Sequence, residues 1–366
     1  MLLTAVFVTA GCARRPGDDV LRAVAQTAPE ARNVTVYVAT SRARQTPGTN
    51  IFNKIHAQDL NYAVFTISIP PTHKPGVIEW AKGVPDPRTD FVTVRERALD
   101  KAEFEQAVRK DSGGKRENIG IFVHGYNTNF PEALFRHVQM SADAGVTEGG
   151  AAILFAWPSA ASYSGYITDR DAATASRDQL VDLLVSVTKG SGRGQSILFG
   201  HSMGGWMVSE ALRQLKLTGR DDVIKKLNVI LAAPDIDAEV FRTQMSVIGP
   251  LSPPMKILVS PDDVALSVSS LLSGNKLRVG QIDVSDPAVQ AAARAAKVQI
   301  IDISDIEAGD RFLHERFAAV AALYPKISAQ QDKGDGLQRA GAFMFDAAAA
   351  TVSAPFVLGA NIVAGR

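Results

Sequence analysis

The chain has 366 residues, and its 46% hydrophobic content is enough for a large core in one or two domains. The 39 basic residues nearly balance the 38 acidic ones, and a net charge of +1 gives no electrostatic reason to expect a nucleic-acid partner. Cys12 is the only cysteine in this sequence, which excludes a cysteine-based zinc site and an intrachain disulfide.

Residues 1–30 are predicted to hold a signal-like N-terminus followed by a polar linker. The apolar stretch Leu2–Ala10 is followed by Gly11 and Cys12 and then by arginines. This order resembles a bacterial lipoprotein signal peptide, which is cleaved before a cysteine that then carries lipid. Two features depart from that pattern: no Lys or Arg precedes the apolar stretch, and Thr9 stands where such signals usually have Leu. We expect an exported protein of the bacterial cell envelope with membrane attachment through Cys12. An ordinary signal peptide and a cytoplasmic protein with an apolar N-terminus are the alternatives.

Strand and helix patterns alternate from residue 31 to residue 325. Strands are predicted over Val34–Thr40, Tyr62–Ile69, Ile119–Val123, Ala151–Ala156, Gln195–Phe199, Leu227–Ala233, Lys256–Ser260 and Val298–Ile303. Helices are predicted over Lys101–Arg109, Pro131–Ala144, Ala172–Lys189, Met203–Leu215, Ala238–Met245, Ala265–Leu272 and Phe312–Leu323. This alternation predicts an α/β fold: one domain over 31–325 with a mostly parallel, doubly wound sheet covered by helices on both faces. The long Pro-rich connection between residues 70 and 90 is predicted to be a lid, a pocket wall or a passive surface loop.

The motif Gly200-His201-Ser202-Met203-Gly204 stands where a predicted strand turns into a predicted helix. That context is the one in which a G-x-S-x-G nucleophile elbow occurs. Such a turn holds the serine in a sparsely allowed backbone conformation, and the glycines leave room for neighbouring backbone. The N-terminal amides of the following helix would face negative charge forming near Ser202. The competing interpretation is a Gly-rich turn with a chance serine.

Polar residues follow several predicted strands at their carboxyl ends, where the ligand site of an open parallel sheet lies. Acyl transfer by a serine requires a base, a carboxylate that orients the base, and donors for the oxyanion. His314 is the only histidine after Ser202, so it is the base if a Ser, Asp, His triad exists in the chain order expected for this fold. The alternative is a surface histidine on the first turn of the last helix.

The acid has four candidates, because Asp235, Asp237, Asp262 and Asp263 all follow strands at this edge. The strand before the histidine strand is the usual supplier, which favours Asp262 or Asp263. The other member of this adjacent pair would cap the following helix.

The oxyanion donors are predicted to be the backbone amides of Tyr126 and Met203. His124 is expected to pack beside the oxyanion loop, with a role as a second base as the alternative. His56, His73 and His137 lie off this edge and are given no role. The sequence has no carboxylate–histidine cluster at metal-ligand spacing, so neither a metal site nor a cofactor is predicted.

Several stretches together resemble a known family. They are Phe122–Asn127, Phe155–Ser159, Gly200–Gly204, Ala232–Asp237 and Asp263–Leu266. The segment from about Val34 to Leu323 resembles the α/β-hydrolase fold, and more narrowly a bacterial family of esterase/lipase-like proteins of poorly defined substrate. The resemblance implies Ser202 as nucleophile, Asp263 as acid and His314 as base.

The tail over residues 326–366 changes composition and becomes Ala-rich and apolar between Gly341 and Val363. Asp346, Pro355 and Gly359 make it a poor membrane-spanning helix. It is predicted to be a helix packed on the domain or a mobile tail, with a membrane-surface helix as the alternative.

Taken together, the sequence predicts a serine hydrolase that cleaves a small-molecule or lipid ester through an acyl-enzyme. An acyltransferase and a non-catalytic envelope protein that binds a partner are the alternatives.

Overall fold

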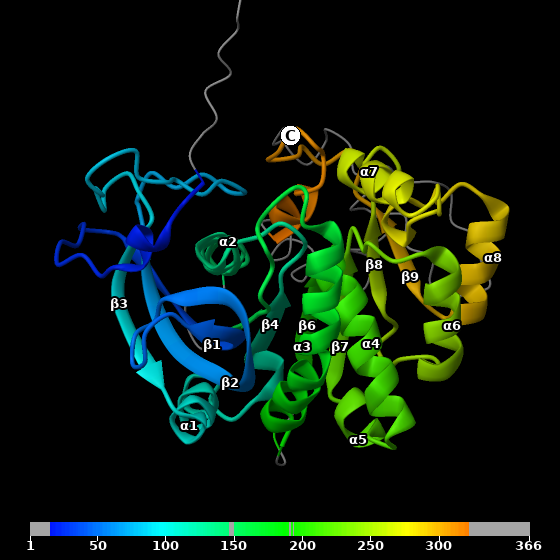
Figure 1. Ribbon diagram of the computed structural model, residues 1–366, viewed down its shortest axis with the longest axis horizontal. Helices are drawn as coiled ribbons and strands as arrows, with labels where there is room; N and C mark the ends of the chain where they lie inside the picture. The colour runs from blue at the N-terminus through cyan, green and yellow to red at the C-terminus, as the bar shows by residue number, and fades with distance from the viewer. Residues whose placement is uncertain (1–14, 146–149, 190–191, 193, 322–366) are drawn as a thin grey trace, which may run out of the picture.

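The computed structural model of the chain (Figure 1) describes residues 15–145, 150–189, 192 and 194–321. Cys12 and the tail over 326–366 lie outside the described residues, so lipid attachment and the role of the tail stay predictions. Within the described ranges, no helix has the length and apolar character needed to cross a bilayer.

The described residues form a nine-stranded sheet in the order β3-β2-β1-β5-β4-β6-β7-β8-β9. The strands are β1 (Arg32–Arg44), β2 (Phe52–Ile69), β3 (Val92–Leu99), β4 (Ile119–Val123), β5 (Ala151–Ala156), β6 (Ser196–His201), β7 (Leu227–Ala232), β8 (Lys256–Val259) and β9 (Gln299–Asp302). β2 runs antiparallel to β1 and β3, and the remaining neighbours are parallel. The predicted α/β architecture with a mostly parallel sheet is confirmed.

Helices cover both faces of the sheet, as Figure 1 shows. They are α1 (Lys101–Asp111), α2 (Phe130–Asp143), α3 (Tyr166–Val187), α4 (Met203–Leu217), α5 (Asp221–Ile224), α6 (Ala238–Ile248), α7 (Val264–Leu272) and α8 (Pro287–Ala296), with a last helical segment over 316–321. Alternate residues of β1 point to opposite faces. Tyr37 and Ala39 belong to the core under α1, α3, α4 and α6, whereas Val36 and Val38 belong to the core under α2 and the 316–321 helix.

The first hundred residues differ from the sequence prediction in several places, and β2 begins at Phe52, ten residues before the predicted Tyr62. β3 was not predicted, because its central Arg95-Glu96-Arg97 is exposed and polar, and its register is set by antiparallel pairing with β2. The expected linker after residue 18 instead packs on that strand. Leu21 is buried, and the Val24 amide donates to the Thr93 carbonyl oxygen at 2.8 Å.

The last predicted helix begins later than expected, and His314 precedes it instead of lying on its first turn. The Asp310 side chain accepts hydrogen bonds from the backbone amides of Phe312, His314 and Glu315 at 2.9–3.0 Å. Leu313 has a φ of 60°, which is incompatible with a right-handed helix. Helical structure therefore starts at residue 316.

The central strands β4, β6 and β7 reach the same level of the sheet at their carboxyl ends. Val123 of β4 pairs with Gly200 of β6, and His201 pairs with Ala232 of β7. The turns that follow these strands, together with α7 and the segment after β9, gather at the upper edge in Figure 1. The sheet therefore brings side chains from distant parts of the chain to one edge.

Candidate active site

Ser202 lies at the turn between β6 and α4 in a strained conformation, with φ 54° and ψ −122°. A non-glycine residue adopts such a positive φ at a cost, and the surrounding packing holds it there. Gly204 makes that packing possible, because a Cβ built on it would lie 2.4 Å from the carbonyl oxygens of Val123 and His124. The elbow predicted from the sequence is thus present, with α4 beginning directly behind the serine.

His314 is in direct contact with Asp263. The imidazole Nδ1 lies 2.6 Å from Asp263 Oδ2, and the other carboxylate oxygen accepts the Leu266 backbone amide at 2.9 Å. Asp263 is the N-cap of α7, and its side chain has no exposed surface. One aspartate therefore both caps the helix and contacts the imidazole, two roles that the sequence divides between neighbouring residues.

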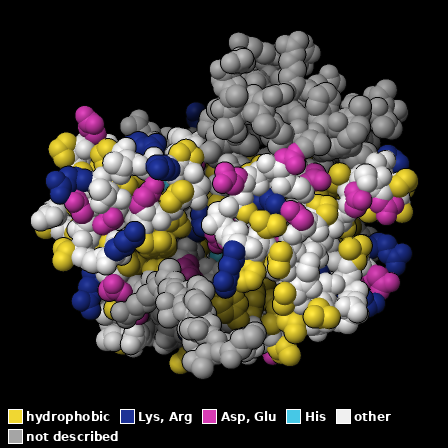
Figure 2. Space-filling model, turned by 90° about the horizontal axis from the view of Figure 1, so that it is seen from above, with side chains coloured by type: hydrophobic (Ala, Val, Ile, Leu, Met, Phe, Trp, Pro, Cys, Tyr) yellow, Lys and Arg dark blue, Asp and Glu magenta, His cyan; other side chains and the backbone are white. Residues whose placement is uncertain are grey.

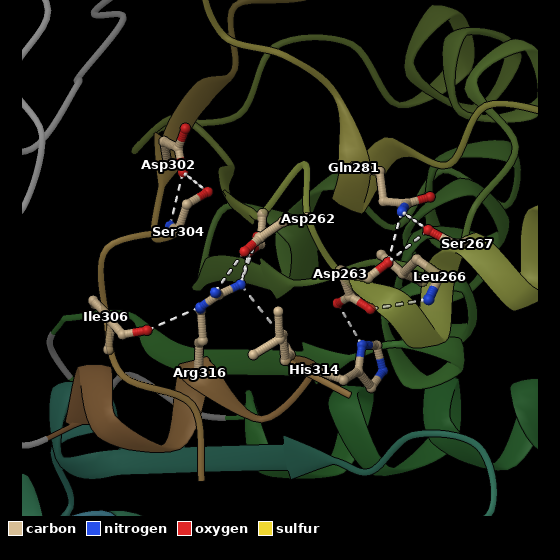
Figure 3. Close-up of polar contacts among 12 residues, drawn as sticks. Asp262, Asp263, Leu266, Ser267, Gln281, Asp302, Ser304, Ile306, His314 and Arg316 are labelled. Atoms are coloured by element: carbon tan, nitrogen blue, oxygen red, sulfur yellow. Dashed lines mark hydrogen bonds and ion pairs between the residues drawn. The ribbon is translucent and has the colours of Figure 1, made fainter. Parts of the chain in front are cut away.

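Asp262 points away from His314, as Figure 3 shows. Its carboxylate accepts two hydrogen bonds from the Arg316 guanidinium, both at 2.7 Å, and one from the Ser260 hydroxyl. The hydrogen bonds and charge of Arg316 hold the pKa of Asp262 below its usual range, despite an opposing effect of burial. The structure therefore does not bring this alternative acid to the histidine.

Asp235, another alternative acid, belongs to a separate buried cluster at the side of the pocket, and Asp237 caps α6 by accepting the Glu239 and Val240 amides. Its carboxylate accepts hydrogen bonds from the Ser269 hydroxyl at 2.6 Å and the Tyr166 hydroxyl at 2.9 Å. Arg278 lies 3.3 Å from the same carboxylate, and both side chains are 3% exposed. Within the described residues, the side-chain partners of the Asp235 carboxylate are these three residues.

The surroundings of His314 favour its protonated form. Burial lowers the pKa of the imidazole, but the charge and hydrogen bond of Asp263 raise it, and the charges of Asp310 and Asp235 add to that effect. The net result is a pKa above the ordinary 6.5. His314 is therefore suited to hold a proton taken from a nearby hydroxyl.

The neighbouring histidines are held neutral. Burial lowers the pKa of His124 to about 3, and its ring stacks on Trp157 with a centroid separation of 4.8 Å. Burial also lowers the pKa of His201 well below its ordinary value, and the nearby His314 charge has the same direction of effect. The His201 ring lies 4.6 Å from the His314 ring and stacks at 4.0 Å on Phe317. His124 thus packs beside the oxyanion loop.

The loop after β4 lies directly against Ser202. A Cβ built on Gly125 would be 2.8 Å from Ser202 Cβ, so only a glycine lets this backbone approach so closely. Within the described part of the chain, the backbone amides of Tyr126 and Met203 donate no hydrogen bond. Both predicted oxyanion donors are therefore unpaired beside the elbow.

Asp169, which the sequence analysis missed, holds this loop in place. Its buried carboxylate accepts the Asn127 amide at 2.9 Å, the Ala160 amide at 2.5 Å and the Ser159 hydroxyl at 2.6 Å. It thereby ties the loop after β4 to the loop after β5. A lone aspartate on the first turn of a helix gives no sequence signal of these partners, which become neighbours only in the folded chain.

Ser202 and His314 line the same cavity of about 540 Å³, a volume typical of small-molecule sites. Its walls include Ile78 and Trp80, so the Pro-rich connection contributes a pocket wall. Figure 2 looks onto this edge and shows a central hollow with hydrophobic side chains gathered beside it. The described residues contain no group of three or more His, Cys, Asp or Glu side chains that could hold a metal ion.

Comparison with protein families gives a match over residues 97–331 to alpha/beta hydrolases of unknown function (DUF900). The chain belongs to this family. The matched region of this α/β-hydrolase includes the elbow, Asp263 and His314, and its fold is the one the sequence predicted. The family supports a hydrolase activity. The curated proteins contain no match to the chain.

Proposed function

We propose that this α/β-hydrolase cleaves a carboxylic ester through an acyl-enzyme, with Ser202 as nucleophile, His314 as base and Asp263 as the acid that orients it. The observation that carries the proposal is the 2.6 Å contact between Asp263 and His314 at the pocket that Ser202 also lines. A hydroxyl, an imidazole and a carboxylate in this order are what acyl transfer by serine requires.

In the proposed reaction, Ser202 Oγ attacks the ester carbonyl carbon while its proton passes to His314 Nε2. Asp263 accepts the hydrogen bond from Nδ1–H, which leaves Nε2 free to receive that proton and stabilises the imidazolium. The carbonyl oxygen becomes an oxyanion, for which the amides of Tyr126 and Met203 are the donors.

Collapse of this intermediate expels the alcohol, which takes the proton from His314 and leaves Ser202 acylated. A water molecule then attacks the acyl carbon, again giving its proton to His314, and the carboxylic acid is released as Ser202 recovers its proton. Hydrolysis of the ester thus consumes one water and restores every side chain.

A fluorophosphonate probe tests the proposal, because it phosphonylates a serine only where a base activates it. We expect the wild type to be labelled and Ser202→Ala and His314→Ala to lose the label. Ser164→Ala, an exposed serine in the loop after β5, is the matched control and should keep it. A folded wild type that takes no label would refute the proposal and favour a binding role for the pocket.

A further inference from the structure

The exposed hydrophobic side chains of the described residues are concentrated around the mouth of the cavity. Of the twelve large ones, eight lie on three segments that also supply cavity-lining residues: 77–84, 163–167 and α7. We call these three segments the rim. The eight are Val77, Val84, Tyr163, Ile167, Val264, Val268, Leu271 and Leu272. Scattered exposed hydrophobic residues are normal in proteins, whereas a group around one opening indicates an interaction surface.

Helix α7 contributes a continuous apolar face to the rim. Val264, Val268, Leu271 and Leu272 follow the spacing of one side of a helix and are 41–68% exposed. The other side of the helix is buried through Leu266. Val268 and Leu272 also line the cavity, so the apolar face is continuous with the entrance to Ser202.

The N-terminal segment emerges at the same mouth. Arg15 lines the cavity, and its guanidinium donates to Glu132 and to the Ala161 carbonyl oxygen, each at 2.6 Å. The segment before it, which includes Leu2–Ala10 and Cys12, therefore joins the described chain beside the cavity. Three residues span about 10 Å at most. Lipid on Cys12 would hold the rim close to the membrane.

We propose that the rim docks on the surface of a lipid bilayer and that the ester cleaved at Ser202 belongs to a lipid of that bilayer. The substrate assignment rests on the proposed ester hydrolysis, and the docking rests on the rim and on the position of Arg15. A second protein seated on the rim would cover the entrance to Ser202, whereas a bilayer supplies the substrate through it. Two of the carboxylates that line the cavity and would be repelled by an anionic surface are paired with arginine: Glu132 with Arg15 and Glu315 with Arg136.

Vesicle sedimentation tests the docking without requiring catalysis. The parent protein is the full chain with Cys12→Ser, which removes any lipid anchor, mixed with vesicles of phosphatidylcholine and phosphatidylglycerol. Leu271→Asp is compared with Leu217→Asp. The two leucines are 68% and 61% exposed, but Leu217 ends α4 at the opposite edge of the sheet. We expect Leu271→Asp to lower the vesicle partition coefficient about tenfold or more, because it places a charge in the apolar contact. Leu217→Asp should change it by less than about twofold.

Equal vesicle binding by the two variants would overturn the proposal, and so would a parent that does not bind vesicles. Self-association of the parent that Leu271→Asp abolishes, without vesicle binding, would assign the rim to a second copy of the chain and also overturn it. Turnover of a short water-soluble ester should be equal in both variants. A parent protein that takes no fluorophosphonate label but binds vesicles in a Leu271-dependent way would refute the proposed ester hydrolysis and leave the docking proposal standing. The failures of the two proposals are therefore distinguishable.

Discussion

Replacement of Asp263 by asparagine, compared with the same change at Asp262, is the sharpest test of the candidate active site. The two residues are adjacent in sequence, but they contact different partners. Asp263 contacts His314 and is fully buried, whereas the Asp262 side chain is 49% exposed and contacts Arg316. The same chemical change should therefore abolish most of the activity at position 263 and leave it nearly unchanged at position 262.

The expected magnitude for Asp263→Asn follows from its two hydrogen bonds. The Leu266 amide needs an acceptor, so the asparagine oxygen would stay there and the NH₂ group would face His314 Nδ1. That forces the imidazole proton onto Nε2, the atom that must accept the serine proton. A triad with this wrong tautomer loses about 10⁴-fold in kcat, which corresponds to about 5.4 kcal/mol of transition-state stabilisation.

Asp262→Asn should instead affect mainly stability. Arg316 keeps the Ile306 carbonyl oxygen at 2.9 Å as a partner, and Asp262 is half exposed. The Arg316 side chain is only 7% exposed and its pair with Asp262 is bidentate, so removal of the carboxylate charge should cost about 1–3 kcal/mol of unfolding free energy. We expect kcat/KM for a soluble ester to stay within about threefold of the wild type, since such a substitution acts away from the reacting groups.

The pH profile separates an electrostatic role of Asp263 from a purely structural one. His314 must be neutral to act as a base, so kcat/KM should rise with pH through its raised pKa. Removing the Asp263 charge lowers that pKa, and the acid limb should shift to lower pH while the plateau falls. Circular dichroism would verify that both variants are folded. The assignment is refuted if Asp262→Asn abolishes turnover while Asp263→Asn does not, or if the acid limb of Asp263→Asn stays in place.

Three further predictions address packing, the oxyanion loop and a histidine outside the site. Gly204→Ala places a Cβ 2.4 Å from two backbone oxygens and should cost about 3 kcal/mol of unfolding free energy in denaturant titration. Gly120→Ala, whose Cβ meets open space, should change it by less than about 1 kcal/mol, and equal effects of the two variants would contradict the packing at the elbow. Asp169→Asn places an NH₂ group against hydrogen-bond donors of the loops after β4 and β5. It should lower kcat about 10²-fold with a smaller change in KM. A change in KM alone would argue against a role of Asp169 in positioning the oxyanion donors. His73 lies between the carboxylates of Glu79 and Asp143 at 2.8 and 2.9 Å, which raise its pKa although burial opposes them. The stabilisation by protonated His73 is therefore complete below pH 6.5 and is lost as pH rises through the raised folded-state pKa. The difference in unfolding free energy between wild type and His73→Gln should shrink as pH rises from 6.5 through that pKa. A pH-independent difference would contradict a protonated His73.

The sequence by itself determined the elements whose signals are local. Alternating strand and helix patterns gave the parallel part of the sheet, with β4 and β5 at the predicted residues. Gly200 and Gly204 marked the elbow, because a tight turn between strand and helix needs small residues at fixed offsets. The chain order Ser, Asp, His selected His314, because it is the only histidine after Ser202 in this sequence.

Tertiary structure decided what depends on contacts between distant segments. The carboxylates of Asp262 and Asp263 have the same chemistry and nearly the same position in sequence. The partners that distinguish their roles, Arg316 and His314, lie more than fifty positions away. The polar strand β3 forms because β2 offers it a paired edge. Asp169 lies at the oxyanion loop because three chain segments converge there. Local patterns encode backbone geometry, but which side chains meet is set by how the whole sheet assembles, and that information is spread over the entire chain.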